Sequence, residues 1–477
     1  MVTCSKHSYS ERIEKWKKKR LIVLCLIVKT RVTINNRKKS KEIQMTNLLL
    51  QDPFSVLKEY PDKLTYSLEN PLHTECVRFS PRGDYLALGC SNGGVVIYDM
   101  DTFRPICVLG NKMGAHMRSV QSISWSPDGK YLLTGSRDWS VKLWDLASAA
   151  QPLKQVRFDS PIWNCQWVEA DQFVCVVTVL EESSAFLIDF ALDQPLIRTL
   201  HGDENNDDHG YVLTSTVHTK FSDIIFTGTS KGWINVYQLY KGESDSNVAR
   251  MMKGLKVANG NIKHVIVSQQ GDKIAVNCSD RSIRQYAFTL AADHSSVELE
   301  LEHKYQDVIN KLQWNSIFFS NKAAEYLVAS THGSSAHELY LWETSSGTLV
   351  RVLEGSEEEL MDIDWNFYKM FIASNGLESG DVYIWSIVIA PKWSALAPDF
   401  EEVEENVDYR EKEDEFDQID ELEQQEELNQ AEEVDIDLRT REQFDVRGND
   451  LLITQFTIPT DYERILTLKA AKLSHDY

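Results

Sequence analysis

Short runs of alternating apolar and polar residues recur along the chain, and each run contains an aromatic side chain or an aliphatic substitute near its end. Such alternation over four to eight residues is typical of a half-buried β-strand. The seven runs are VVIYDM (95–100), VKLWDL (141–146), AFLIDF (185–190), INVYQL (234–239), IRQYAF (283–288), LYLWET (339–344) and VYIWSI (382–387). The equivalent positions are Tyr98, Trp144, Ile188, Tyr237, Tyr286, Trp342 and Trp385, at spacings of 46, 44, 49, 49, 56 and 43 residues. The pattern predicts seven copies of one β unit.

Each run belongs to a longer unit, seen most clearly in SVQSISWSPDGKYLLTGSRDWSVKLWD (119–145). This stretch predicts a strand, an S-P-D-G turn, a second strand, a tight S-R-D-W turn and a third strand. Residues 75–99 and 263–287 repeat the layout. The repeat resembles the WD40 family, whose propellers have a period of about 40–45 residues and four strands per blade. The resemblance covers about 60–390 and implies an all-β fold, a seven-bladed WD40 β-propeller.

The second copy also contains the polar residues of a WD40 network. The resemblance implies that a His, a Ser or Thr, an Asp and a Trp are hydrogen-bonded and tie the turn of the blade to its inner strands. In this copy they are His116, Thr134, Asp138 and Trp144. The position of Asp138 is occupied by Asn92, Lys231 and Ala336 in the first, fourth and sixth copies. We therefore expect an intact network in few blades, with a structural role.

Closure of the ring requires one more strand. Nothing regular follows Trp385 to complete the last blade, whereas residues 62–69, DKLTYSLE, alternate apolar and polar positions before the first copy. An unpaired edge strand invites association with other chains. We predict that 62–69 forms the outer strand of the last blade, which leaves residues 1–50 without a place in the ring.

Charge divides the chain of 477 residues, whose formal net charge is −22. Residues 1–44 contain 13 Lys/Arg against 3 Asp/Glu, and the apolar stretch 21–28 is too short to cross a bilayer. The basic cluster and the apolar stretch together resemble the start of a signal peptide, but no small-residue cleavage site follows them. We favour the alternative that 1–44 is disordered or upstream sequence and that translation begins at Met45. A mildly acidic body argues against nucleic-acid binding through bulk charge.

The cysteines show no C-x-x-C pair and no metal-ligand spacing with His, and most lie in apolar, strand-like runs. This distribution predicts buried free thiols and favours a reducing compartment. The eight are Cys4, Cys25, Cys76, Cys90, Cys107, Cys165, Cys175 and Cys278.

We find no catalytic constellation in the chain, which has no Walker-type loop and no H-E-x-x-H. The acidic and His-containing cluster HGDENNDDHG (201–210) raises the question of a metal site, but its Asn and Gly content favours a solvated loop between blades. We therefore expect a protein that is not an enzyme and that uses no cofactor, metal or small-molecule substrate. Fold alone does not establish this.

The composition changes abruptly after Trp385. Residues 399–437 contain 20 Asp/Glu against Arg410 and Lys412, yet Phe400, Val407, Tyr409 and Phe416 recur among the acids. A disordered, solvated tail is one interpretation of the acidic composition. Such tails normally lack large apolar side chains, however, because nothing there can bury them. The other is an extended peptide that docks into partner grooves, with the acids steering it toward basic surfaces.

The stretch WSALAPDFEEVEENVDYREKEDEFD (393–417), with NLLLQDPF after Met45, resembles the retinoblastoma-binding protein 5 family, which includes the fungal COMPASS subunit. The resemblance implies three partner contacts. Residues 394–407 would lie against a SET-domain methyltransferase subunit through Ser394, Ala397, Pro398, Phe400 and Val407. Residues 408–421 would bind an Ash2-type SPRY-domain subunit through Tyr409, Glu411, Glu413, Glu415, Phe416 and Asp417. Residues 431–438 would bind a second WD40 subunit through Glu433, Val434, Asp435 and Ile436.

The same resemblance places the propeller near nucleosomal DNA, with basic residues of the fourth and fifth copies as candidate contacts. These are Lys231, Arg250, Lys253, Lys256, Arg281 and Arg284, for which ordinary solvated surface is the alternative. Residues 449–477 are apolar enough to order on a partner or to fold back on the ring.

The resemblance implies a nuclear, non-catalytic scaffold of a COMPASS-type histone H3 lysine-4 methyltransferase, bound to nucleosomes weakly or indirectly and not to membranes. A generic WD40 adaptor in ubiquitin ligation or RNA processing is the alternative function, and an enzyme with an unrecognised axial site is a third. We expect four parts: a basic extension (1–44), the propeller (45–390), an acidic partner-binding segment (391–448) and a partly apolar C-terminal segment (449–477).

Overall fold

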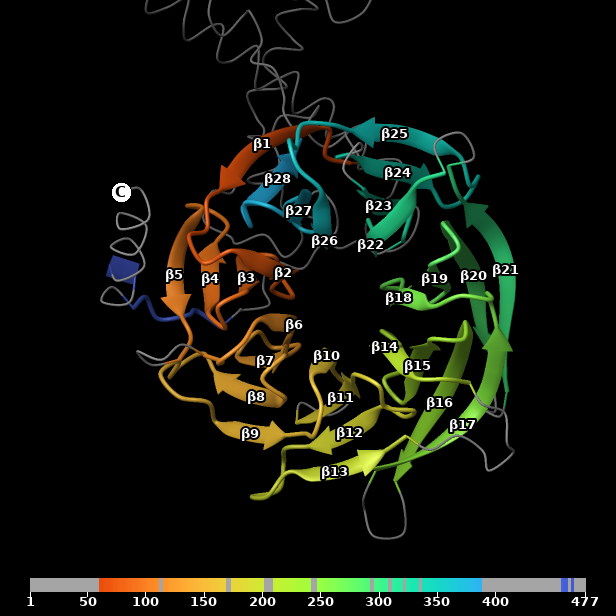
Figure 1. Cartoon of the computed structure of the whole chain (residues 1–477), viewed down its shortest axis with the longest axis horizontal. Helices are drawn as coiled ribbons and strands as arrows, with labels where there is room; N and C mark the ends of the chain where they lie inside the picture. Colours follow the sequence, from red (N-terminus) through yellow and green to blue (C-terminus); the bar gives the residue numbers. More distant parts are fainter. Residues whose placement is uncertain are drawn as a thin grey trace, which may run out of the picture. The chain divides into compact units, whose positions relative to one another are not determined.

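The computed structural model describes residues 60–387, with gaps at 111–114, 169–172, 201–208, 242–246, 292–295, 308–310, 321–322 and 334–336, together with 456–461 and 465–466. All of them belong to one compact unit, which spans 60–388 and 455–477. They form seven four-stranded antiparallel sheets around a central axis (Figure 1). The prediction of an all-β, seven-bladed propeller is confirmed.

Blades 1 to 6 each use four consecutive strands, ordered from the axis outward. The first three blades contain β2 (Thr74–Phe79), β3 (Tyr85–Cys90), β4 (Val95–Asp99) and β5 (Arg104–Val108); β6 (Val120–Trp125), β7 (Tyr131–Ser136), β8 (Ser140–Asp145) and β9 (Lys154–Arg157); and β10 (Ile162–Trp167), β11 (Val174–Val179), β12 (Phe186–Asp189) and β13 (Leu196–Thr199). The next three contain β14 (Val212–Val217), β15 (Ile224–Thr229), β16 (Trp233–Lys241) and β17 (Asn247–Lys256); β18 (Ile262–Val267), β19 (Lys273–Cys278), β20 (Ser282–Leu290) and β21 (Val297–Tyr305); and β22 (Gln313–Phe319), β23 (Tyr326–His332), β24 (Leu339–Glu343) and β25 (Leu349–Leu353).

The seventh blade joins the two ends of the ring. It contains β26 (Leu360–Asn366), β27 (Phe371–Gly376) and β28 (Val382–Ser386), and its outer strand is β1 (Lys63–Leu68). Leu64 lies opposite Trp385, and Leu68 lies opposite Val382. The prediction that residues 62–69 complete the last blade is therefore confirmed. Residues 1–59, which include the start of the expected propeller segment 45–390, lie outside the described residues.

Packing between blades explains why the repeated aromatic positions recur. Both faces of each inner sheet region are covered by neighbouring blades, so a strand such as β11, VCVVTV, is buried at every position. The repeated positions lie in the third strand of each blade, where Trp144 and Trp385 are almost fully buried. A buried aromatic side chain, replaced by Ile188 in blade 3, therefore fills the space between adjacent sheets.

The described part of the C-terminal segment packs against blade 1. Ile458 is buried in a cluster with core residues of blades 1 and 2, and Phe456 packs against the same cluster. The amide of Asp461 donates a hydrogen bond to the carbonyl oxygen of Ile106 in β5 at 3.0 Å. Of the two alternatives for residues 449–477, folding back on the ring is therefore confirmed for residues 456–461.

The cysteines within the described residues behave as the sequence predicts. Cys76, Cys90, Cys107, Cys165, Cys175 and Cys278 are all free and buried. Burial raises the pKa of Cys90 to about 12, so this thiol stays protonated and unreactive at neutral pH. No helix in the described part of the chain is both long enough and apolar enough to cross a bilayer.

Candidate functional site

Blade 2 contains the predicted WD40 network intact. The Nδ1 atom of His116 lies 2.9 Å from Oδ2 of Asp138, and its Nε2 atom lies 2.7 Å from Oγ1 of Thr134. The indole N–H of Trp144 donates to the same Thr134 oxygen at 2.9 Å. Ser140, which sequence reasoning missed, donates its hydroxyl to Asp138 at 2.6 Å. The network links the β7–β8 turn to strands β7 and β8.

Electrostatics hold this network in one protonation state. Burial lowers the pKa of His116, although Asp138 opposes the shift. Burial alone would raise the pKa of Asp138, but hydrogen bonds from His116 and Ser140 hold this pKa well below the ordinary range. In blade 1 the equivalent Asn92 accepts only a local bond from the amide of Gly94, at 2.9 Å. The aspartate contacts that tie the turn to the strands in blade 2 are therefore not repeated by Asn92 in blade 1.

The candidate DNA contacts are only partly brought together. We call the face that carries the turns between the second and third strands of the blades the upper face; its turns include 137–139, 230–232 and 279–281. Lys231 and Arg281 lie in two of these turns and are exposed. Lys256 is exposed opposite Trp233, at the upper-face end of β17. These three residues form a basic edge on blades 4 and 5.

The other three candidates are less available to a phosphate. The Arg284 Nη2 atom lies 2.5 Å from Oδ2 of Asp280, so its charge is compensated. The ammonium group of Lys253 donates to the carbonyl oxygen of Val297 at 3.1 Å. Arg250 lies opposite Gln238, five residues along β16 from the upper-face end. The basic edge is therefore smaller than the sequence predicts.

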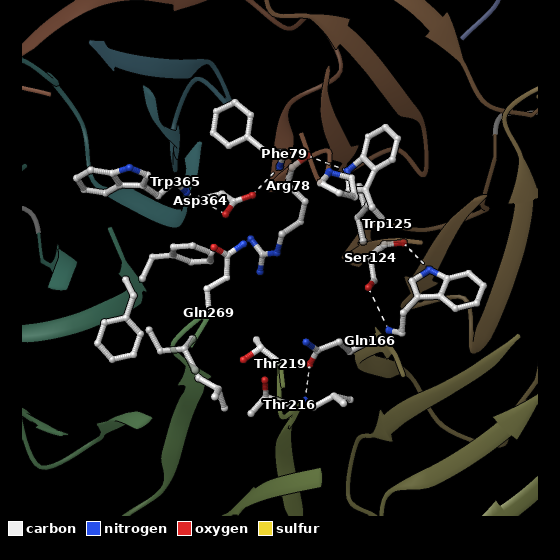
Figure 2. A pocket seen from close by; sticks show the side chains of 18 of the residues that line it. Arg78, Phe79, Ser124, Trp125, Gln166, Thr216, Thr219, Gln269, Asp364 and Trp365 are labelled. Carbon is white, nitrogen blue, oxygen red and sulfur yellow. Dashed lines mark hydrogen bonds between the residues drawn. The ribbon is translucent and has the colours of Figure 1, made fainter. Parts of the chain in front are cut away.

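A cavity of about 520 Å³, lined by both polar and apolar residues, occupies the centre of the ring. Figure 2 shows the guanidinium group of Arg78 projecting into it, with Gln166 and Gln269 among the residues around it. Arg78 comes from β2, and its Nη1 atom forms an ion pair with Oδ2 of Asp362 from β26 at 2.6 Å. Sequence reasoning missed this cavity, although charged residues inside the apolar runs CVRFS and DIDWN are an available signal.

The carboxylates beside Arg78 join blade 7 to blade 1. Asp362 accepts the amide of Val77 at 3.2 Å, and Asp364 accepts the amide of Phe79 at 2.5 Å. Burial raises the pKa of Asp364 to about 7, against the lowering influence of Arg78. These groups use most of their bonding capacity to hold the first and last blades together. The charges in the cavity are accordingly structural.

Nothing in the described residues forms a recognisable catalytic or metal-binding arrangement. No group of three or more His, Cys, Asp and Glu side chains within the described ranges could hold a metal ion. Residues 201–208, the larger part of the cluster questioned as a metal site, lie outside them. The expected partner contacts, from Ser394 to Asp417 and from Glu433 to Ile436, also lie outside the described residues, as does Ala336.

The fold and its polar network define a WD40 propeller, and the comparisons with known proteins agree. The family described as "WD domain, G-beta repeat" matches residues 107–145. The chain is 65% identical over 432 residues to COMPASS component SWD1 of Saccharomyces cerevisiae, covering 89% of this chain and 100% of the relative. It is 38% identical over 379 residues to Set1 complex component swd1 of Schizosaccharomyces pombe, covering 78% and 90%.

Two further similarities define the family. The chain is 33% identical over 376 residues to the retinoblastoma-binding protein 5 homolog of Drosophila melanogaster, covering 78% of this chain and 72% of the relative. The solved Cps50 (Swd1) β-propeller domain of Myceliophteria thermophila superimposes with a TM-score of 0.61 at 32% identity, covering 68% of this chain and all of that one. The chain belongs to the Swd1/retinoblastoma-binding protein 5 family.

Proposed function

We propose that this chain is a non-catalytic scaffold subunit of a COMPASS-type histone H3 lysine-4 methyltransferase complex. The observation that carries the proposal is its 65% identity to a COMPASS component over the whole length of that relative. The alignment of 432 residues is longer than the stretch 60–387, so the similarity extends beyond the propeller. We assign the chain to the nucleus on the same basis.

The acidic segment would supply the activating contacts. We propose that 394–407 lies against the SET-domain subunit, that 408–421 binds an Ash2-type SPRY-domain subunit and that 431–438 binds a second WD40 subunit. Ordering ten backbone residues costs about 10–20 kcal/mol, whereas burying one apolar anchor returns about 1.5–3 kcal/mol. Anchors such as Phe400 and Phe416 therefore need backbone hydrogen bonds and charge pairs as well.

Connection to a folded ring makes such weak contacts effective. Once one contact forms, the others become intramolecular, and their effective concentration can reach the millimolar range. The propeller, whose ring is closed by the pairing of β1 with β28, provides a rigid attachment for the three peptide contacts. The basic edge on blades 4 and 5, with Lys231, Lys256 and Arg281, would add a weak contact to nucleosomal DNA.

Reconstitution tests the proposal directly. The full chain and a variant lacking residues 393–421 would each be combined with the SET-domain, SPRY-domain and second WD40 subunits, and methyl transfer to a histone H3 peptide measured. We expect the full chain to stimulate transfer and the deletion to abolish stimulation, while circular dichroism shows the same folded propeller. A deletion of equal length within 1–44 serves as the control and should leave stimulation intact.

Other outcomes separate the competing functions. Failure of the full chain to associate with these subunits would favour the generic adaptor. Transfer by the isolated chain would favour an enzyme. Full stimulation by the deletion variant would show that the acidic segment does not activate the SET-domain subunit.

A further inference from the structure

The upper face of blades 2 and 3 exposes three large apolar side chains. Met117 is 85% exposed, Trp163 is 42% exposed and Trp139 is 40% exposed. Exposed single apolar residues are common, but Trp, Met and Arg together are the composition of protein interfaces. Neither the WD40 network nor the central cavity includes the exposed rings of Trp139 and Trp163.

Within blade 2, Trp139 contacts the end of β9, from which the chain continues into blade 3. The carbonyl oxygen of Trp139, in the β7–β8 turn, accepts the amide of Phe158 at 2.8 Å. The guanidinium group of Arg157 lies 5.9 Å from the centre of the Trp139 ring. The loop that continues from Phe158 leads into β10, whose second residue is Trp163. Trp139, in the β7–β8 turn of blade 2, and Trp163, in β10 of blade 3, therefore lie at the upper-face ends of adjacent blades.

The backbone of Trp139 adopts a conformation that a bulky side chain does not favour. Its φ is 69°, a left-handed conformation that a bulky residue adopts at an energetic cost. The equivalent turn position is Gly93 in blade 1, Gly232 in blade 4 and Arg281 in blade 5, which have φ values of 87°, 79° and 68°. Glycine adopts this conformation readily, so blade 2 holds an exposed indole where the turn itself favours Gly. Backbone strain of this kind is associated with functional positions.

The charges around the tryptophans narrow the class of partner. Arg118, Arg137 and Arg157 are exposed beside the apolar side chains and can bind carboxylates. Asp159 and Glu181 are also exposed. The loops that contain them are adjacent, because the amide of Leu180 donates a hydrogen bond to the carbonyl oxygen of Pro161 at 2.9 Å. These two carboxylates would repel a continuous phosphate backbone. A short peptide can place its own acids at the arginines and leave Asp159 and Glu181 in solvent.

We propose that this surface, made of Met117, Trp139, Trp163 and the three arginines, binds an acidic peptide that carries one bulky apolar side chain. The apolar side chain packs on the indole rings and Met117, which is flexible enough to adapt to its shape. Carboxylates on either side of it pair with Arg118, Arg137 and Arg157. The surface is separate from the basic edge on blades 4 and 5, and its use does not depend on the DNA contacts proposed there.

A titration with defined peptides tests this surface in the full-length chain. The chain is labelled with 5-fluorotryptophan, and the fluorine resonances of Trp139 and Trp163 are assigned from single Trp→Phe variants. The probe is a nine-residue peptide with a central Phe flanked by four Asp or Glu on each side. We expect both resonances to shift saturably and a peptide with Ala in place of Phe to bind more weakly. The chain's own acidic segment is present in every variant, so its competition is the same throughout.

Two variants and one control make the test specific. Trp139→Gly removes the indole and relieves the backbone strain, so we expect at least a tenfold loss of affinity in a chain that is as stable as the parent or more so. The Arg118→Gln, Arg137→Gln double variant should bind more weakly and with a smaller dependence on salt. The control Tyr240→Ala removes a similarly exposed aromatic from β16 and should bind normally.

Three results would overturn the proposal. One is full affinity of the Trp139→Gly variant. Another is the absence of any saturable shift up to about 1 mM peptide. The third is tighter binding of an oligothymidylate of equal length, which would assign the surface to single-stranded nucleic acid instead.

Discussion

Individual polar residues hold this propeller at two different places, and the pKa values of the two carboxyl groups involved are shifted in opposite directions. In blade 2, Asp138 is charged and accepts bonds from His116, Ser140 and the amide of Met117. At the junction of blades 7 and 1, Asp364 is buried with its pKa raised to about 7. An ionised carboxylate stabilises the fold only where the hydrogen bonds that it accepts outweigh the free-energy cost of removing it from water. The two sites therefore respond differently to substitution and to pH.

Asp138→Asn tests the network in blade 2. The amide group of Asn would point an N–H toward a donor that the carboxylate now satisfies, so we expect a loss of about 1–3 kcal/mol in the free energy of unfolding. Urea denaturation followed by fluorescence measures it. Asp101→Asn, whose side chain is 75% exposed and pairs with Lys369, is the control and should change stability by less than about 0.5 kcal/mol. Equal effects of the two substitutions would contradict a stabilising network.

Asp364 predicts a pH dependence of stability. Its pKa is higher in the folded chain than in the unfolded chain, so the folded state binds more protons between pH 4 and 7. The stability linked to this group is fully present below about pH 4 and is lost as pH rises through about 7. His116, His218 and His264, whose pKa values burial lowers, give the opposite trend below their ordinary pKa.

Comparison with Asp364→Asn isolates this contribution, because the histidines contribute to both proteins. One pKa unit corresponds to about 1.4 kcal/mol, so the parent should lose about 2 kcal/mol relative to the variant between pH 5 and 7. Urea denaturation at intervals of half a pH unit measures the difference. Parallel curves for the two proteins would contradict a raised pKa at Asp364.

At the scale of strands and segments, both ends of the described chain are attached to the ring. β1 completes blade 7 beside β28, and residues 456–461 pack on β5 of blade 1. The described chain is therefore part of the ring before the acidic segment, at β28, and packs on the ring after it, at Phe456. A segment attached at both ends has fewer conformations than a free tail, which reduces the entropy lost when it binds.

Ile458→Asp tests the second attachment. Ile458 is 4% exposed, and a carboxylate there would be buried without a partner, so we expect residues 456–461 to detach. Hydrogen exchange of the Asp461 amide, which bonds to Ile106, should speed up at least tenfold while exchange in β6 to β8 changes little. Leu466→Asp is the matched control, because Leu466 is 64% exposed. Unchanged exchange in the Ile458 variant would show that this residue does not hold the segment.

The sequence predicts the strands better than it predicts these attachments. Seven equivalent positions, six of them aromatic, and the alternation in 62–69 are sufficient to predict the ring and its closure, because each signal is either repeated or required by geometry. Phe456 and Ile458 lie in the single short stretch QFTIPT, where no periodicity indicates what they contact. Arg78 and Asp362 are close only because the first and last blades meet, at a separation of 284 residues. The His116 network was predictable because all of its members lie within one repeat.

At the scale of the whole molecule, the net charge of the chain and the local charge of its surface differ in sign at one place. The chain is acidic overall, with a formal net charge of −22, yet the upper face of blades 4 and 5 presents Lys231, Lys256 and Arg281. Screening limits the acidic segment's effect on a distant basic residue to about one Debye length, roughly 8 Å at physiological salt. A small basic edge can therefore contact DNA phosphates on an acidic protein, but only weakly and in a salt-dependent way.

A weak, salt-dependent contact predicts the effect of Lys256→Gln combined with Arg281→Gln in the assembled complex bound to nucleosomes. Each cation that neutralises a DNA phosphate releases counterions, so losing both should reduce the slope of log K against log salt by about 2. The loss of affinity should be nearly independent of DNA sequence, because phosphate contacts position a protein without reading bases. Arg250→Gln is the matched control, since Arg250 lies five register positions from the upper-face end of the same blade. Binding isotherms at four salt concentrations measure the three slopes, and an unchanged slope in the double variant would mean that blades 4 and 5 face away from DNA.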